Sequence, residues 1–446
     1  MSAVSSDASV ASVVLRWRGP ISALAPQDRR GLLERTASTE HDVRERTGGI
    51  VDRVRREGDV ALRALAVEFD GVTLGELEVP RSRWTRALEA LEPDLRRAME
   101  RATANIERVH GAFMPRAQET ESEPGIVVGR RPDPLRCVGV YAPGGRAAYP
   151  SSVLMGVVPA RVAGVEEIVV CSPPLRETGR PSDVVLAAAA LAGASRVFAL
   201  GGAGAVAAMA YGTASVPRVD RIVGPGNAYV AEAKLQVSRA VAIDSPAGPS
   251  ELLVVADDAA DPVLIARELL AQAEHDPLAA VVAVSTSERG ADAISAALAA
   301  QLDAQPRAAI CAAALAGQGA VLWAESLADA IAFANDYAAE HLLLVVTELD
   351  AALARLRNAG TVFVGASASV AFGDYMTGAN HVLPTGGLAR SYSGLSSLDF
   401  VRWTTYQRIT PQAAARLAVD VGNFADAEGL AGHAMAARAW RDGARP

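Results

Sequence analysis

The 446-residue sequence contains few cysteines, and they lack the spacing that holds a structural metal ion or a redox disulfide. Cys137, Cys171 and Cys311 form no CxxC pair and cannot all be bridged, which is typical of a reducing compartment. The sequence also lacks the HExxH motif of metal-dependent hydrolases, and this absence argues against a hydrolase of that class.

An excess of positive charge and a long apolar segment are missing as well. The net charge of -8 and the pI of about 5.4 argue against nucleic acid as the main partner. The uncharged stretch 197–217 is rich in glycine and alanine and is too weakly apolar to span a membrane. The stretch 1–20 lacks a basic n-region and carries Asp7, so we expect no signal peptide. A cytoplasmic protein without nucleic-acid or membrane partners is predicted.

Short apolar runs alternate with helical patterns over most of the chain. Residues up to about 120 are mostly helical by pattern, and the next runs end in Gly or Pro: 136–143, 166–174, 195–202 and 219–227. A second series starts at 250–257 and continues to 341–347. Alternation of this kind predicts α/β architecture, with parallel sheets that are covered by helices on both faces.

The helix predicted at 262–275 ends in an unusual group of polar side chains. Asp261-Pro262 is a helix start signal, and Pro277 stops the helix after a last turn that contains Gln272 and His275. These two residues stand three apart, so their side chains project side by side. A plain alternative for Gln272 is that its amide caps free carbonyl groups at the helix end.

Four of the six histidines lie in polar clusters at element ends or in loops, namely His275, His341, His381 and His433. A single histidine is more often a hydrogen-bonding residue than a metal ligand. Four such clusters favour one shared site. Gln272, His275, Asp374 and His433 would supply nitrogen and oxygen ligands that suit Zn²⁺.

Glu340 and His341 lie where a helix gives way to the apolar run LLLVV. A carboxylate beside an imidazole can activate water or move protons near neutral pH. The alternative is a histidine that the helix dipole favours at a helix C-terminus. The sequence alone leaves both interpretations open.

Gly-rich turns follow several of the predicted strands. Gly202-Ala-Gly204-x-x-Ala207 matches the dinucleotide fingerprint only superficially, whereas Gly-Pro-Gly before Asn227 places a good N-cap at a helix start. Tyr141 follows a strand and can stack on a cofactor base or brace a turn. Ser250 lies at the junction of the two α/β series, where ligand clefts are common, although it can equally be a turn residue.

Taken together, these motifs resemble the histidinol dehydrogenase family. The matching stretches keep the family's order between about residues 137 and 435: YAPGG, GPGN, EAK, AIDSPAGPSE, QAEHDP, AAEHL, GDYMTGANHVLPTGG, SGLS and AEGLAGH. Each stretch is short, but jointly they are highly specific.

The resemblance implies a role for each matching residue. It implies one zinc ion per subunit, held by Gln272, His275, Asp374 and His433, with His433 supplied across a homodimer. Glu340 and His341 would be the catalytic pair. Histidinol would be surrounded by His341, the metal ligands and three further residues: Ser250, His381 and Glu428. NAD would contact Tyr141, Asn227 and the position of Gly204, where the family usually has glutamine.

The resemblance also implies a domain arrangement of two Rossmann-like parallel-sheet domains, one of them discontinuous. We place an N-terminal segment at 1–30 and a first α/β domain at 31–136 plus 250–395. A second Rossmann-like domain with the NAD-contacting loops is placed at 137–249. A C-terminal helical segment at 396–446 is expected to reach the partner subunit.

The activity that the resemblance implies is oxidation of L-histidinol through L-histidinaldehyde to L-histidine, with two NAD reduced per substrate. In this hypothesis His341 removes the hydroxyl proton, and Glu340 then activates water to attack the aldehyde. One alternative is a related zinc- and NAD-dependent enzyme that acts on another small polar alcohol, such as a sulfonated diol. A second alternative is a metal hydrolase that does not use NAD.

Overall fold

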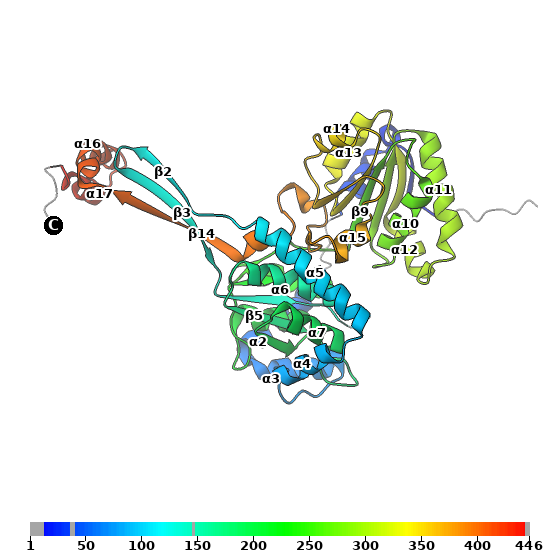
Figure 1. The fold of residues 1–446 in the computed structure, drawn as a ribbon, viewed down its shortest axis with the longest axis horizontal. Coiled ribbons are helices and arrows are strands. Elements are labelled where there is room, and N and C mark those ends of the chain that lie inside the picture. Colours follow the sequence, from blue (N-terminus) through cyan, green and yellow to red (C-terminus); the bar gives the residue numbers. More distant parts are fainter. Residues whose placement is uncertain (1–12, 36–40, 145–147, 442–446) are drawn as a thin grey trace, which may run out of the picture.

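The computed structural model describes residues 13–35, 41–144 and 148–441. It consists of two parallel-sheet domains and a long arm that extends away from both of them (Figure 1). The predicted α/β architecture is therefore confirmed. Residues 1–12 of the expected N-terminal segment and 442–446 of the expected C-terminal segment lie outside the described residues. No helix among those described has the length and apolar character to cross a membrane.

The six-stranded domain is built on a parallel sheet whose strands are buried on both faces. Its strand order is β1 (Trp17–Pro20), β11 (Gly319–Trp323), β10 (Ala280–Ser285), β9 (Glu251–Ala256), β12 (His341–Val345) and β13 (Thr361–Val364). Alternate residues of a strand point to opposite faces. Leu252 and Val254 accordingly join one core cluster, and Leu253 and Val255 join another.

Helices cover both faces of this sheet. One face packs against α10 (Pro262–Ala273), α11 (Glu288–Leu302) and α12 (Ala308–Gln318). The other face packs against α1 (Pro26–Leu33), α13 (Leu327–Tyr337) and α14 (Leu349–Leu353). A short helix, α15 (Val370–Tyr375), follows β13. This double coverage explains why the strands read as continuous apolar runs.

The five-stranded domain contains the second parallel sheet. Its order is β6 (Arg196–Ala199), β5 (Glu167–Ser172), β4 (Cys137–Tyr141), β7 (Arg221–Val223) and β8 (Ala242–Ile243). The helices within the same stretch are α6 (Pro150–Val162), α7 (Asp183–Ala192), α8 (Gly202–Tyr211) and α9 (Ala228–Val237). Its core also includes residues from α2 (His41–Glu57), α3 (Asp59–Leu65), α4 (Arg81–Glu89) and α5 (Pro93–Ala112).

The division of the N-terminal region between the domains differs from the boundaries that we placed on the sequence. Residues 41–112 pack on the five-stranded domain, because Val51, Leu62, Trp84 and Ile106 lie in one core cluster with β4 and β5. Strand β1, which precedes residue 31, pairs instead with β11 of the six-stranded sheet. An amphipathic helix carries no mark of the sheet that it will cover, so its pattern cannot assign it to a domain.

The arm combines two distant parts of the sequence. Strands β2 (Gln118–Glu123), β3 (Ile126–Pro134) and β14 (Val401–Ile409) form an antiparallel sheet in the order β14-β3-β2. Helices α16 (Pro411–Ala427) and α17 (Ala431–Arg438) lie at its tip, far from α10 and α15 (Figure 1). Phe424 and Met435 on these helices are 72% and 73% exposed. A single chain therefore leaves both apolar side chains open to solvent.

The loop-rich stretch from residue 366 to 400 connects the two domains. Asn380 donates from Nδ2 to the carbonyl of Met155 on α6 at 2.8 Å. Ser397 donates its N–H to Nδ1 of His110 on α5 at 3.2 Å, and its Oγ donates to the carbonyl of His110 at 2.9 Å. These buried bonds hold the loop against the five-stranded domain after it leaves the six-stranded one.

His110 makes the stability of this connection depend on pH. Burial lowers the pKa of His110 to about 4 from 6.5. The unfolded chain therefore binds this proton more tightly, and stability is lost as the pH falls from 6.5 toward 4. We expect His110→Asn, which keeps an acceptor for Ser397 but cannot titrate, to flatten this slope. Urea unfolding between pH 4.5 and 7.5 measures it, and parallel slopes for both proteins would contradict the assignment.

Candidate active site

Glu340 and His341 lie at the amino edge of the six-stranded sheet. Helix α13 ends at Tyr337, and Ala338 adopts a left-handed conformation, so His341 opens β12 rather than closing a helix. The helix-dipole alternative therefore does not apply. Strand β9 runs parallel beside β12, with Leu252 opposite His341, which brings Glu251 and Ser250 next to the pair. Glu340 and His341 are 6% and 4% exposed.

The main chain of Glu251 holds both members of the pair. Its N–H donates to Oε2 of Glu340 at 2.7 Å, and its carbonyl oxygen lies 3.0 Å from Nδ1 of His341. A carbonyl only accepts, so Nδ1 carries the proton. Nε2 of His341 is buried, has no hydrogen-bond partner and lies 3.6 Å from Oδ1 of Asp374. The imidazole thus turns its second nitrogen toward Asp374.

The charges of this cluster reinforce one another. Burial alone would lower the pKa of His341, but the Glu340 carboxylate, and then Asp374, raise that pKa to about 10. Burial alone would raise the pKa of Asp374, but His341, and then His381 and His275, lower it. Burial raises the pKa of Glu340 despite the neighbouring imidazole. His341 and His381 thus lie beside Asp374, and His275 is near enough to lower its pKa.

Candidate metal ligands reach this cluster from α10 and α15. Gln272 is 3% exposed in the last turn of α10, and His275 follows directly, with its N–H bonded to the Gln272 carbonyl. Asp374 lies in α15. Its neighbour His381, by its Nδ1, donates to the Asp374 carbonyl at 2.8 Å. Nε2 of His341 is a buried nitrogen without a partner that faces Asp374, and the Gln272 amide and the Asp374 carboxylate supply oxygen ligands that suit a cation.

A single chain does not bring the whole predicted set together. Within the described part of the chain, no group of three His, Cys, Asp or Glu residues is arranged to hold a metal ion. His433 lies in α17 and Glu428 directly follows α16, so both belong to the tip of the arm and are exposed (Figure 1). Ser250 is half-buried beside the pair. The arm separates two of the predicted residues from all the others.

The predicted cofactor residues lie at the carboxyl edge of the five-stranded sheet. Tyr141 ends β4, and its hydroxyl oxygen accepts from the Gly202 N–H at 3.0 Å. Burial raises the pKa of Tyr141 to about 12. Asn227 caps α9, as predicted, and its Oδ1 accepts from the N–H groups of Tyr229 and Val230. The carboxyl edge of a parallel sheet is where such folds bind nucleotides.

Gly204 lies inside α8 and faces the interior of the domain. A Cβ at this position would lie 3.1 Å from Cδ1 of Leu65 and 3.6 Å from Cδ2 of Leu62. Both leucines belong to α3. A side chain larger than hydrogen must therefore displace the packing between α3 and α8, and a glutamine here would need Leu65 to move.

A buried ion pair that the sequence analysis did not single out braces the Gly-Pro-Gly turn. Lys234 and Asp244 form this ion pair, with side chains 3% and 4% exposed. Lys234 donates to the Gly224 carbonyl at 3.0 Å, and the Asp244 carboxylate accepts from the Gly224 N–H at 2.7 Å. The available signal was the lysine of EAK, together with the aspartate that follows the apolar run VAI.

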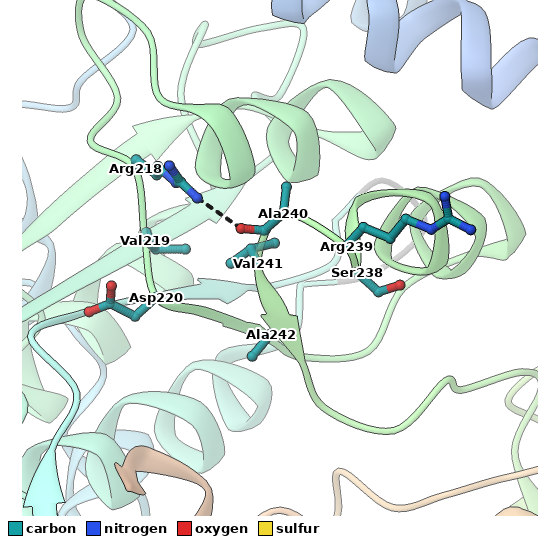
Figure 2. A pocket seen from close by; sticks show the side chains of 8 residues that line it. All are labelled: Arg218, Val219, Asp220, Ser238, Arg239, Ala240, Val241 and Ala242. Carbon is teal, nitrogen blue, oxygen red and sulfur yellow. Dashed lines mark hydrogen bonds between the residues drawn. The ribbon is translucent and has the colours of Figure 1, made fainter. Parts of the chain in front are cut away.

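A shallow pocket of about 380 Å³ lies at the opposite, amino edge of the five-stranded sheet (Figure 2). Two of its polar side chains bond to the chain itself. Arg218 donates to the Ala240 carbonyl at 2.9 Å, and Asp220 accepts from the N–H groups of Arg136 and Cys137. The pocket lies away from the residues described above, and we assign no chemistry to it.

Comparison with known proteins places this geometry in a family. The family model for histidinol dehydrogenase matches residues 33–441. The chain belongs to the histidinol dehydrogenase family. It is therefore a dehydrogenase, an oxidoreductase. The histidinol dehydrogenase of Halobacterium salinarum is 51% identical over 412 residues, which are 92% of this chain and 96% of that protein. The enzyme of Methanosarcina barkeri is 44% identical over 94% of this chain and 96% of its own.

A solved structure supports the same assignment. The crystal structure of histidinol dehydrogenase from Elizabethkingia anophelis matches with a TM-score of 0.91 and 32% identity. The match covers 97% of this chain and 98% of the other. Both domains and the arm therefore belong to the histidinol dehydrogenase fold, and the predicted family resemblance is confirmed.

The Gly-Pro-Gly turn should be intolerant of any side chain at its first residue. Gly224 has a φ of +113°, and a Cβ there would lie 2.1 Å from the Tyr141 carbonyl oxygen. We expect Gly224→Ala to cost about 3 kcal/mol of unfolding free energy or more, because strain and a backbone clash add. Gly49→Ala is the control, because Gly49 lies in α2 with open space around it. Equal urea midpoints for both variants would contradict this prediction.

Proposed function

We propose that the protein oxidises L-histidinol through L-histidinaldehyde to L-histidine and reduces two NAD per substrate. The observation that carries this proposal is the buried Glu340–His341 pair, which the Glu251 main chain orients beside Asp374. Family membership supports it, because the relatives named above are histidinol dehydrogenases. It favours histidinol over a sulfonated diol and argues against an NAD-independent hydrolase.

The two residues of the pair have separate tasks in this proposal. His341 keeps the Nδ1 proton on the Glu251 carbonyl, and its Nε2 accepts the hydroxyl proton of the alcohol. The Glu340 carboxylate deprotonates the water that attacks the aldehyde. Its raised pKa makes it a better base than an exposed glutamate. Burial of both groups keeps bulk water away and so protects the aldehyde between the two oxidations.

Gln272, His275 and Asp374, with His433 of the partner subunit, would hold one zinc ion per subunit. Bound there, zinc would act as a Lewis acid that polarises and orients the substrate. Asp374 helps to raise the pKa of His341, and it would do so less if its carboxylate also held a cation. The His341 imidazole would then be closer to the range in which it accepts a proton. Ser250, His381 and Glu428 would complete the substrate pocket.

NAD is proposed to bind at the carboxyl edge of the five-stranded domain. Asn227 opens α9 after the Gly-Pro-Gly turn, and the dipole at this helix start favours a pyrophosphate. Tyr141 lies beside this turn, because a Cβ added at Gly224 would lie 2.1 Å from the Tyr141 carbonyl oxygen. Gly204 offers no side chain, so main-chain groups would have to replace any contact of a glutamine.

A homodimer with exchanged arms would complete the site. In a single chain His433 and Glu428 are exposed at the arm tip, among apolar side chains such as Phe424, Leu430 and Met435 that lack cover. Docking the tip on a second copy would bury these side chains and deliver the missing ligand. A two-fold arrangement would form two equivalent sites. The cytoplasmic location remains a prediction from the sequence.

Glu340→Gln should separate the two oxidations. The amide of this variant keeps an oxygen for the Glu251 N–H but cannot deprotonate water. We expect oxidation of histidinaldehyde to fall about 100-fold and the first oxidation of histidinol to fall less than about 10-fold. Single-turnover NADH formation from each substrate measures this, and His341→Gln is the reciprocal control. Equal loss of both oxidations in Glu340→Gln would refute the division of tasks.

Mixed dimers test whether the site is shared. His275→Ala and His433→Ala should each be inactive, because each lacks one proposed zinc ligand. In a mixed dimer, one site combines the intact His275 of one subunit with the intact His433 of the other. After statistical exchange of subunits we expect about a quarter of wild-type activity. Mixing without recovery, in samples in which mass spectrometry shows mixed dimers, would exclude a shared site.

A further inference from the structure

A buried ion pair lies directly behind the Glu340–His341 pair. The Glu251 side chain is 3% exposed and receives two hydrogen bonds from Arg35, Nε to Oε1 at 3.0 Å and Nη2 to Oε2 at 2.9 Å. The Gly386 N–H adds a third to Oε1 at 2.7 Å. Glu251 is thus held by its side chain while its main chain holds Glu340 and His341.

Arg35 is itself fixed on all sides. It follows α1, and its side chain is 4% exposed. Nη1 donates to the Leu32 carbonyl at 2.8 Å, and Nη2 donates to the Tyr337 carbonyl at 2.9 Å. The guanidinium carbon lies 3.4 Å from the centre of the Tyr337 ring. A rigid planar cation with this many partners transmits position better than a flexible lysine would.

We propose that Arg35 is a positioning residue, which acts through Glu251 to orient Glu340 and His341. This inference rests on the proposed function. Removing an ion pair from a protein interior is often neutral for stability when apolar residues replace it. We assign the Arg35–Glu251 ion pair to the alignment of the catalytic groups, because the Glu251 main chain contacts both Glu340 and His341. A shift of about 1 Å in such groups can cost about 100-fold in rate.

The test is Arg35→Ala with rescue by added methylguanidinium. The truncation leaves space for a guanidinium group beside Glu251. We expect kcat with histidinol to fall about 100-fold while the KM for histidinol and NAD and the zinc content stay within about twofold. Millimolar methylguanidinium, far below denaturing concentration, should restore at least about a tenth of the lost rate.

Arg29→Ala is the matched control. Arg29 lies in α1 and pairs with Asp336 at 2.8 Å, but the two side chains are 38% and 57% exposed, in contrast to the buried Arg35. The kcat of Arg29→Ala should stay within about twofold of the wild-type value and should not respond to methylguanidinium. Arg35→Lys keeps the charge and serves if Arg35→Ala does not fold. The melting temperature of Arg35→Lys should be near that of wild type. Its kcat should fall about 10-fold, because lysine cannot donate the two parallel hydrogen bonds of a guanidinium.

Each failure has its own signature. If wild type does not oxidise histidinol, the proposed function fails. The orientation of His341 is then read from its ¹⁵N imidazole signals, which should change in Arg35→Ala and not in Arg29→Ala. If wild type is active and neither Arg35 variant loses more rate than Arg29→Ala, the positioning role is overturned. A rate loss that methylguanidinium cannot restore, together with a melting point that falls in proportion, would also overturn it.

Discussion

The hydrogen bonds between the Glu251 peptide groups and the Glu340–His341 pair are the interaction on which the active site depends. Both side chains are more than nine-tenths buried, and a buried polar group without a partner costs about 1–3 kcal/mol. One residue supplies both partners, a donor for Glu340 and an acceptor for His341. It can do so because β9 and β12 are parallel neighbours whose amino ends align. The sheet topology thus fixes the tautomer of the imidazole.

The two sheets present opposite edges to their proposed ligands. The five-stranded sheet offers its carboxyl edge, where Asn227 and Ala228 at the start of α9 are exposed. The six-stranded sheet offers its amino edge. At its carboxyl edge Asp257 accepts the Thr347 N–H and Asp258 accepts a hydrogen bond from Ser287. Carboxylates in those positions repel a phosphate, so a nucleotide is disfavoured there.

Much of this organisation was predictable from the sequence, and the reasons for the remainder are physical. Buried parallel strands read as apolar runs, and Asn227 and Asp261 are strong caps, so the α/β class and two helix starts were predictable. The sequence also pointed to His275, His341 and His381 as polar residues at element ends, and all three lower the pKa of Asp374. That they share one metal site stays a prediction. The packing of helices 41–112 on the five-stranded sheet did not follow, because it is decided by tertiary contact.

The arm and the buried ion pairs were harder to foresee. Strand β2 is charged and fully exposed, and β3 is broken by Gly129, Pro132 and charged residues, so both lack the alternation that marks a half-buried strand. Arg35 and Glu251 lie 216 residues apart, and nothing in either local stretch links them. This pair forms only when the end of α1 meets β9 in the six-stranded domain, and a single sequence carries no sign of such long-range pairing.

The protonation of His341 tests the central claim most directly. The chain has only six histidines, so ¹⁵N-labelled imidazole signals can be assigned with single His→Gln variants. In the zinc-loaded protein the account predicts that Nδ1 of His341 carries the proton and Nε2 does not. A His341 imidazole protonated at Nε2 alone would mean that the Glu251 carbonyl does not orient it, and it would contradict the account.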